Sequence, residues 1–148
     1  MNVSGMQLRT AVPADLPQIY RLLEINDMLG EVESQDCVVA EAAGELTGFA
    51  RLELADGAAY IRPIVVAPDG QGKGVGRELV QYLLLTFPKL RVIARGDALG
   101  FYTRLGFQQM DWDQVYPPFA QECRDCPHLP FCNPQPLEFH SGINPPVV

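Results

Sequence analysis

The sequence lacks the features that define several classes of protein. None of its apolar runs approaches the ~20 residues that a membrane-spanning helix requires. Its 11 basic residues against 18 acidic ones give a net charge of −7, so it lacks the basic surface that nucleic acids and anionic membranes bind. Residues 1–5 contain neither a basic region nor an apolar core, so no secretion signal is visible and a cytoplasmic location is expected.

The size and composition are those of one ordinary globular domain. The chain has 148 residues, of which 47% are hydrophobic and 20% are charged. No internal repeat is visible. Three of the four cysteines lie in the last 32 residues, and that segment also holds eight of the 13 prolines. We therefore treat residues 117–148 as a Pro/Cys-rich appendage without regular helix or sheet, and not as a separate domain.

The segment from Val65 to Arg77 is the most informative part of the chain. Glycine occupies positions 70, 72, 74 and 76, between an apolar strand and an amphipathic helix. Glycines allow the backbone to approach a ligand closely, and the amides at a helix start favour an anion such as a pyrophosphate. The segment is not a P-loop, because Val75 and Gly76 follow Lys73-Gly74 where that motif has Lys-Ser/Thr.

Two other interpretations of this segment remain open. A dinucleotide-binding turn also contains Gly-x-Gly, but it should be followed about 20 residues on by an acid at the end of the next strand. Here the next strand candidate, 90–94, is followed by Arg95. A merely mobile glycine loop is the other alternative, and the clear apolar face of the helix that follows argues against it.

Three segments resemble the GCN5-related N-acetyltransferases (GNAT family). Residues 71–76 match the Gln/Arg-x-x-Gly-x-Gly/Ala signature, residues 98–107 resemble the Ala-x-x-x-Tyr-x-x-x-Gly-Phe segment, and residues 8–16 resemble the opening of that family. The resemblance spans roughly residues 6–116. It implies an α/β (α+β) fold, with a mixed, mostly antiparallel twisted sheet, flanking helices and splayed central strands. An acyltransferase domain is expected over residues 1–116.

The hydrophobic patterns predict the following elements. Strands are expected at 6–12, 37–42, 46–54, 60–66, 90–94 and 108–116. Helices are expected after Asp15 as cap, ending at Gly30; after the glycine loop, ending before Pro88; and after Asp97 as cap, ending at Gly106. Pro63 makes its strand either an edge strand or one with a β-bulge.

The resemblance implies acetyl-CoA as acyl donor. Backbone groups freed at the bulge would pair with its pantetheine arm, and an N–H near Val66 would donate to the thioester oxygen. Tyr102 would protonate the departing thiolate as general acid, and the alternative is a core aromatic on an apolar stripe. The donor-binding residues would be Val65, Val66, Gln71, Gly72, Lys73, Gly74, Val75 and Gly76.

The acceptor side is less well marked. The carboxylates that could act as general base are Glu41, Glu45, Glu53 and Asp97. Tyr60 stands where the family often has an acid, and Arg95 where it frequently has Asn. Arg62 could hold a substrate carboxylate by a forked pair, or it could be an exposed strand residue.

The tail cysteines allow three interpretations. Cys123, Cys126 and Cys132, with His128, could close a tetrahedral zinc site, although only one Cys-x2-Cys pair is present. Reduced, unliganded cysteines are the favoured alternative, so no metal is predicted, and a disulfide or redox role is the third. The tail also faintly resembles the ending of stand-alone N-acetylglutamate synthases and arsenic-resistance acetyltransferases, which favours a small amino acid or similar amine as acceptor.

The sequence therefore predicts an acetyl-CoA-dependent N-acetyltransferase that acts on a primary amine by direct transfer in a ternary complex. The alternative is a catalytically silent acyl-CoA-binding protein, or a metal- or redox-responsive sensor. The expected partner is a small amine, with no nucleic acid and no membrane, and a homodimer is compatible with the resemblance.

Overall fold

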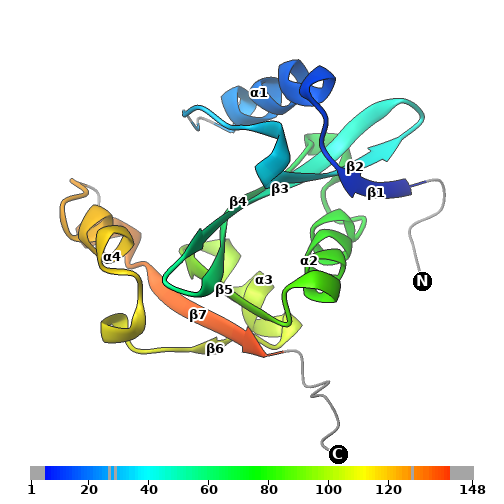
Figure 1. Cartoon of the computed structure of the whole chain (residues 1–148). Coiled ribbons are helices and arrows are strands. Elements are labelled where there is room, and N and C mark those ends of the chain that lie inside the picture. Colours follow the sequence, from blue (N-terminus) through cyan, green and yellow to red (C-terminus); the bar gives the residue numbers. More distant parts are fainter. Residues whose placement is uncertain (1–5, 27, 29, 128, 141–148) are drawn as a thin grey trace, which may run out of the picture. The chain divides into compact units, whose positions relative to one another are not determined.

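The computed structural model of the chain describes residues 6–26, 28, 30–127 and 129–140 (Figure 1). Its strands form a mostly antiparallel sheet in the order β1-β2-β3-β4-β5-β7-β6, as the resemblance implied. The strands are β1 Met6–Thr10, β2 Cys37–Ala42, β3 Glu45–Ala55, β4 Ala58–Val66, β5 Lys89–Ala94, β6 Gln108–Gln109 and β7 Gln135–His140. The α-helices are α1 Leu16–Ile25, α2 Val75–Thr86, α3 Asp97–Leu105, α4 Pro117–Arg124 and α5 Leu129–Cys132.

The chain divides into two compact units. The first comprises Met1–Glu53 and Ile61–Thr86, and the second comprises Leu54–Tyr60 and Phe87–Val148. The splayed central strands that the resemblance implies would involve both units, so this feature stays a prediction. In the described residues, the helices lack the length and apolar character that a membrane crossing requires.

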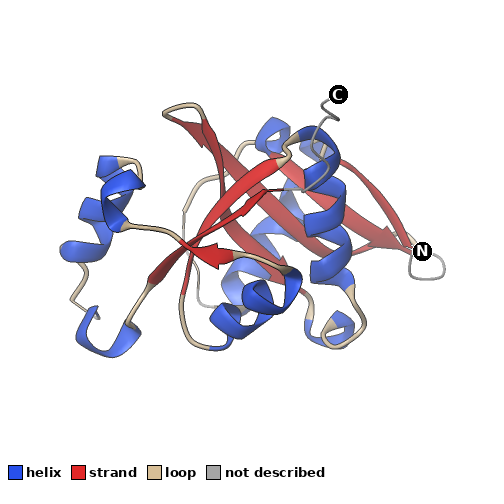
Figure 2. Ribbon diagram, turned by 90° about the horizontal axis from the view of Figure 1, so that it is seen from below, coloured by secondary structure: helices blue, strands red, loops and turns tan. Residues whose placement is uncertain are grey.

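In the first unit, β1, β2 and β3 pair antiparallel, with Met6 opposite Ala42 and Cys37 opposite Arg51. The strands predicted at 37–42 and 46–54 are thus confirmed, and they form a hairpin around Gly44. Helices α1 and α2 lie on opposite faces of these strands (Figures 1 and 2). The core under α1 contains Ile19, Leu22, Leu23, Val39, Phe49 and Val65. Each such side chain contributes roughly 1.5–3 kcal/mol through burial.

The end of α1 differs from the prediction, and its beginning differs in part. Asp15 is the N-cap residue, as predicted, but its carboxylate makes no capping hydrogen bond to α1; it accepts a hydrogen bond from the Val12 amide at 2.8 Å, within the 3-10 turn Pro13–Asp15 that precedes the helix. The helix ends at Ile25, well before Gly30, because the Asn26 side chain donates to the Leu22 carbonyl at 2.8 Å. Asparagine thereby satisfies one of the carbonyls that a helix end leaves unpaired.

Helix α2 follows the glycine loop and ends at Thr86, as predicted. Its buried face consists of Val75, Gly76, Leu79, Val80 and Leu83. Tyr82 of the same helix is half-buried.

In the second unit, β7 pairs antiparallel with both β5 and β6 (Figure 1). The prediction that the chain after Pro117 lacks regular structure is therefore wrong over α4 and β7. Pro117 and Pro118 occupy the first turn of α4, where proline is tolerated because those amides have no partner inside a helix. The high proline count led to a prediction of irregular structure, whereas the segment contains the start of a helix and a six-residue strand.

The segment after α3 also differs in part from the prediction. Gly106 ends α3 with a φ of 109°, as expected, and a Cβ there would lie 2.9 Å from the Phe139 ring. The N-cap is Gly96 rather than Asp97. The strand expected at 108–116 is reduced to the two residues of β6, followed by a 3-10 turn at Trp112–Gln114.

Candidate functional site

The glycine loop is fastened to the neighbouring strand at its beginning. After β4, the Ala67 amide donates to the Thr47 carbonyl at 2.8 Å, and the Gly70 amide donates to the Ala67 carbonyl at 2.8 Å. The Gln71 side chain turns back to the Val66 carbonyl at 3.3 Å. Gln71, the first residue of the signature, thus holds the loop against the end of β4.

One face of this loop is packed tightly against β3. A Cβ at Gly48 would come within 2.9 Å of the Val65 carbonyl oxygen and 3.0 Å of Val75 Cγ1. A Cβ at Gly70 would lie 3.3 Å from the Thr47 carbonyl oxygen. Sequence reasoning missed Gly48, although a glycine inside a strand pattern is a known sign that another backbone approaches closely.

The other face of the loop is open. Gly72 and Gly74 have φ angles of 79° and 84°, which favour glycine, and nothing lies within 4 Å of a Cβ built on Gly72. The Glu78 amide makes the first helical bond of α2, to the Gly74 carbonyl at 3.0 Å. The amides of residues 75–77 precede that bond, so they present the partial positive charge of a helix start. These features suit a phosphate group that approaches a bare backbone.

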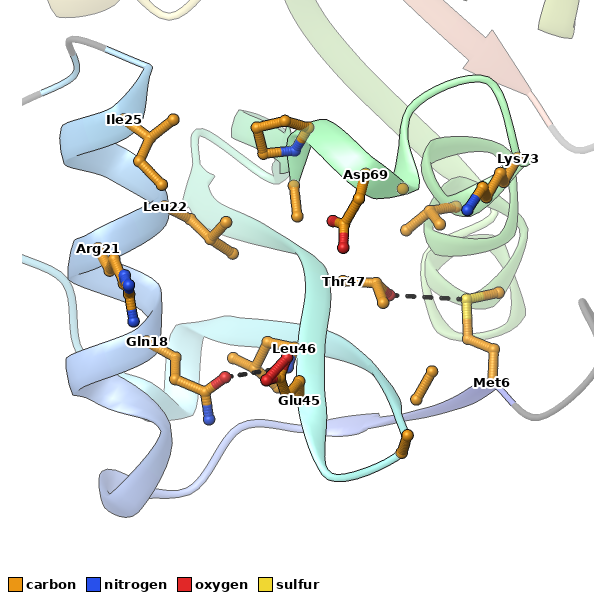
Figure 3. Close-up of a pocket in the computed structure, with 16 residues that line it drawn as sticks. Met6, Gln18, Arg21, Leu22, Ile25, Glu45, Leu46, Thr47, Asp69 and Lys73 are labelled. Atoms are coloured by element: carbon orange, nitrogen blue, oxygen red, sulfur yellow. Dashed lines mark hydrogen bonds between the residues drawn. The ribbon is translucent and has the colours of Figure 1, made fainter.

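A cavity of about 630 Å³ lies within the first unit, between α1, the β2–β3 hairpin and this loop (Figure 3). Arg21 and Lys73 bring positive charge to its lining, and Glu45 and Asp69 bring negative charge. The Gln18 side chain accepts a hydrogen bond from the Leu46 amide at 3.0 Å and so ties α1 to the hairpin. The loop therefore lines this cavity through Asp69, Gly70 and Lys73, and its backbone at Gly72 is open.

Two residues that the sequence assigned to separate roles lie in contact. The Glu53 carboxylate, a candidate base, lies 3.1 Å from Arg62 Nε, and Arg62 is the candidate carboxylate anchor. The other oxygen of Glu53 accepts from Arg51 Nη2 at 2.8 Å, and Arg51 Nη1 donates to the Arg62 carbonyl at 3.0 Å. Arg51 was not predicted, because its partners belong to two strands.

The remaining base candidates have other places in their own units. Glu41 pairs with Arg9 at 3.3 Å, Glu45 lines the cavity, and Asp97 is the first residue of α3 in the second unit.

Tyr102 is a buried residue of the second unit. It is 5% exposed, and its ring packs edge-on against Phe101 and Phe107, with centroids 4.9 and 5.0 Å away. Burial raises the pKa of its phenol above the ordinary value. Tyr102 therefore keeps its proton at neutral pH, which is the form that a general acid needs.

Tyr60, which stands where an acid was expected, serves the core of the second unit. Its hydroxyl oxygen accepts from Arg91 Nη1 at 3.1 Å and from the Tyr116 amide at 2.9 Å. Its ring packs edge-on against Phe119, with centroids 5.0 Å apart. Arg91 is held in turn by Glu138 at 2.7 Å.

The tail cysteines are half-buried, and none of them forms a disulfide with another described residue. Cys132 Sγ accepts from Arg95 Nη1 at 3.7 Å, so the arginine that replaces the expected Asn contacts the tail. His128 lies outside the described residues. Within the part of the chain that the structure describes, Cys123, Cys126 and Cys132 belong to no group of three or more metal-ligating side chains.

Comparison with known proteins identifies the family. Residues 33–109, just over half of the chain, match the model of the Acetyltransferase (GNAT) domain. The chain belongs to the GNAT acetyltransferase family, which confirms the resemblance carried by its glycine loop.

Solved structures share the fold at low sequence identity. N-acetylglutamate synthase from Neisseria gonorrhoeae, complexed with coenzyme A and N-acetyl-glutamate, is 22% identical, with a TM-score of 0.73 over 90% of this chain. The chain spans about a third of that protein, 34% of its length. Rv2747 from Mycobacterium tuberculosis, in complex with CoA and NLQ, is 21% identical, with a TM-score of 0.70 over 90% of this chain and 98% of its own.

A third similar structure comes from a more distant protein. It is diaminobutyrate acetyltransferase EctA from Paenibacillus lautus, in complex with L-2,4-diaminobutyric acid and coenzyme A. This protein is 12% identical, with a TM-score of 0.58 over 71% of this chain and 79% of its own. These likenesses confirm the predicted fold class.

Proposed function

We propose that the protein transfers the acetyl group of acetyl-CoA to the primary amine of a small amino acid or similar metabolite, directly and within a ternary complex. The observation that carries this proposal is the glycine loop between β4 and α2 in a GNAT family member. Its open backbone at Gly72 and the amides at the start of α2 fit a diphosphate.

The donor would lie along the end of β4 and the loop. Acetyl-CoA supplies an activated thioester when it is bound. The amides of Val75 and Gly76 would hold its diphosphate, with Gly72 and Gly74 letting the backbone approach and Lys73 adding positive charge. Gln71 would keep the loop closed onto β4 through its bond to Val66.

The chain's own groups would then serve the transfer. A backbone N–H near Val65 and Val66 would donate to the thioester oxygen, where negative charge develops. Tyr102 would give a proton to the departing sulfur, since burial keeps its phenol protonated.

The acceptor class follows from Arg62. A guanidinium recognises a carboxylate through two parallel hydrogen bonds, so Arg62 would select amines that also carry a carboxylate. Two similar structures hold amino acids or their acetylated forms, namely N-acetyl-glutamate and L-2,4-diaminobutyric acid. Both ligands support a small amino acid as acceptor here.

The location and partners are part of the proposal. The net charge of −7 supports a protein with no nucleic-acid or membrane partner. A cytoplasmic location and a homodimer stay predictions.

The experiment is an acceptor screen. The purified protein is incubated with acetyl-CoA and each proteinogenic L-amino acid, with and without a chelator, and free CoA thiol is measured. We expect thiol release with a small set of amino acids, unchanged by the chelator. Acetyl-CoA binding without release in any reaction would contradict the proposal and favour the silent sensor. Loss of activity with the chelator would indicate that a metal takes part, with the tail cysteines as its candidate ligands.

A further inference from the structure

Glu53 is held at both of its carboxylate oxygens. Oε1 accepts from Arg51 Nη2 at 2.8 Å, and Oε2 lies 3.1 Å from Arg62 Nε. The side chains of Arg51, Glu53 and Arg62 are 22%, 29% and 26% exposed, so the cluster is mostly covered, and Arg62 Nε itself is buried. A carboxylate held at both ends in this way cannot turn, and loss of one contact lets it turn toward another partner.

We propose that the acceptor's carboxylate replaces Glu53 on Arg62 and thereby frees Glu53 to act as the general base. This inference rests on the proposed function and adds to it a catalytic residue and the reason for its selectivity. The two carboxylates compete for the same guanidinium, so binding of the substrate and release of the base become one event.

Arg51 would keep Glu53 beside β4 during this exchange. It holds Glu53 through Nη2 and the backbone of β4 through its bond to the Arg62 carbonyl at 3.0 Å. When Oε2 leaves Arg62, the contact from Oε1 to Arg51 therefore keeps the carboxylate beside β4. Glu53 turns about this contact and stays within reach of the acceptor.

The position of Glu53 suits this role. The amine and the carboxylate of an α-amino acid are bonded to the same carbon, so an acceptor whose carboxylate lies on Arg62 holds its amine close to that guanidinium. Glu53, whose Oε2 lies 3.1 Å from Arg62 Nε, is then close to the amine.

The proton transfers balance as follows. The acceptor ammonium gives a proton to Glu53, the nitrogen bonds to the acyl carbon, and the carbon–sulfur bond breaks. Two protons leave the nitrogen in all. One passes to solvent through Glu53, and the other replaces the proton that Tyr102 gives to the sulfur. No oxidant or further reactant is needed.

The test compares Glu53→Gln with the wild type on two acceptors. The first acceptor is the best amino acid from the screen, and the second is its α-carboxamide, which is neutral at that position and cannot displace Glu53 from Arg62. Glu24→Gln, at an exposed position on α1, is the matched control, and Glu53→Asp is the conservative variant. Thermal melting of each variant checks folding.

For the amino acid, we expect Glu53→Gln to lower kcat by about 100-fold, the contribution typical of a general base, while the acceptor KM stays equal or falls. Glu53→Asp should recover most of kcat. At saturation, the wild type should turn over the carboxamide at least about 10-fold more slowly than the amino acid, since its base stays paired. In Glu53→Gln, the ratio of kcat for the amino acid to kcat for the carboxamide should approach one. If Glu53 had only a structural role, Glu53→Gln would lower kcat equally for both acceptors and leave the ratio of the two kcat values unchanged.

Three results would overturn the inference. They are an unchanged kcat in Glu53→Gln, an equal loss for both acceptors, or a wild type that turns over the carboxamide as fast as the acid. Each leaves the proposed function intact, because wild-type thiol release is measured in the same assay. Absence of wild-type release with every amino acid would instead overturn the proposed function, and this inference with it.

Discussion

Arg9 and Asp15 form a forked ion pair that joins β1 to the turn before α1. Arg9 Nη1 and Nη2 lie 2.7 and 3.0 Å from the two oxygens of Asp15, whose side chain is 8% exposed. The hydrogen bonds from Arg9 hold the pKa of this carboxyl below its ordinary value, against the opposing effect of burial.

Replacing Asp15 by Asn should destabilise the protein by about 2 kcal/mol at pH 7, because charge-assisted hydrogen bonds are lost at a mostly buried site. Urea denaturation measures the change. Asp36→Asn, at an exposed position, is the matched control and should have little effect.

The effect of Asp15 should depend on pH. Its folded pKa is lowered, so its contribution is fully present above the unfolded pKa of about 3.9 and is lost as pH falls through the folded pKa. The difference between wild type and Asp15→Asn should therefore be constant above about pH 5 and shrink in more acid solution. A difference that grows on acidification would contradict this account.

Gly48→Ala should weaken both stability and donor binding. Its Cβ would meet the Val65 carbonyl and Val75, so the backbone beneath the loop must shift, at a cost of about 1–3 kcal/mol. Thermal melting and acetyl-CoA titration measure the two effects. Gly100→Ala is the comparison, since only the flexible end of Arg104 lies near its Cβ. Equal melting of the two variants would count against close packing at Gly48.

Gly72→Ala tests the open face of the loop. The substitution strains a residue with φ of 79° and also places a methyl group where the diphosphate is expected. Gly44→Ala shares the strain, with φ of 81° and open space around it, but lies in the hairpin turn. We expect Gly72→Ala to raise the acetyl-CoA KM about 10-fold beyond any change in Gly44→Ala, as the loss of one good hydrogen-bonded contact would. Similar KM values in both would place the donor elsewhere.

Tyr102→Phe should lower kcat by about 100-fold while leaving the fold intact, because only the proton donor is removed. Tyr82→Phe on α2 is the control, and kcat at saturating substrates is the measurement. Since burial raises the pKa of Tyr102, the wild-type rate should not fall through loss of this proton between pH 7 and 9. A fully active Tyr102→Phe would make this residue a core aromatic only.

Arg62→Ala should raise the acceptor KM by roughly 10- to 100-fold, the range expected for a charge-assisted hydrogen-bonded pair. The acetyl-CoA KM should stay the same. Initial rates with each substrate varied in turn separate the two constants. An equal rise in both would reject Arg62 as the carboxylate anchor.

The sequence predicted those parts of the fold whose signals are local. The β2–β3 hairpin, the glycine loop and the end of α3 at Gly106 follow from turn residues and hydrophobic period, and the structure confirms them. The strand β7 escaped prediction because Pro136 and the surrounding composition suggested a loop, whereas pairing with β5 and β6 decides its conformation. Tertiary pairing overrides a weak local preference in such cases.

The candidate site, like the fold, could be predicted only where its signals are local in the sequence. Positions on the loop could be identified from glycine spacing, because their chemistry belongs to the backbone. The contacts among Arg51, Glu53 and Arg62 depend on which side chains two adjacent strands bring together, and one sequence does not fix that register. The partners of Tyr60 were hidden for a similar reason, since Arg91 and Tyr116 are 31 and 56 residues away along the chain.

The position of β7 between β5 and β6 bears on how the chain is made. Residues 135–140 are synthesised after β5 and β6, so these two strands must wait for them before the ladders with β7 can close. Until then the nascent second unit exposes unpaired strand edges, which are prone to self-association. A stop codon placed just before Gln135 would therefore yield aggregates rather than a shortened enzyme.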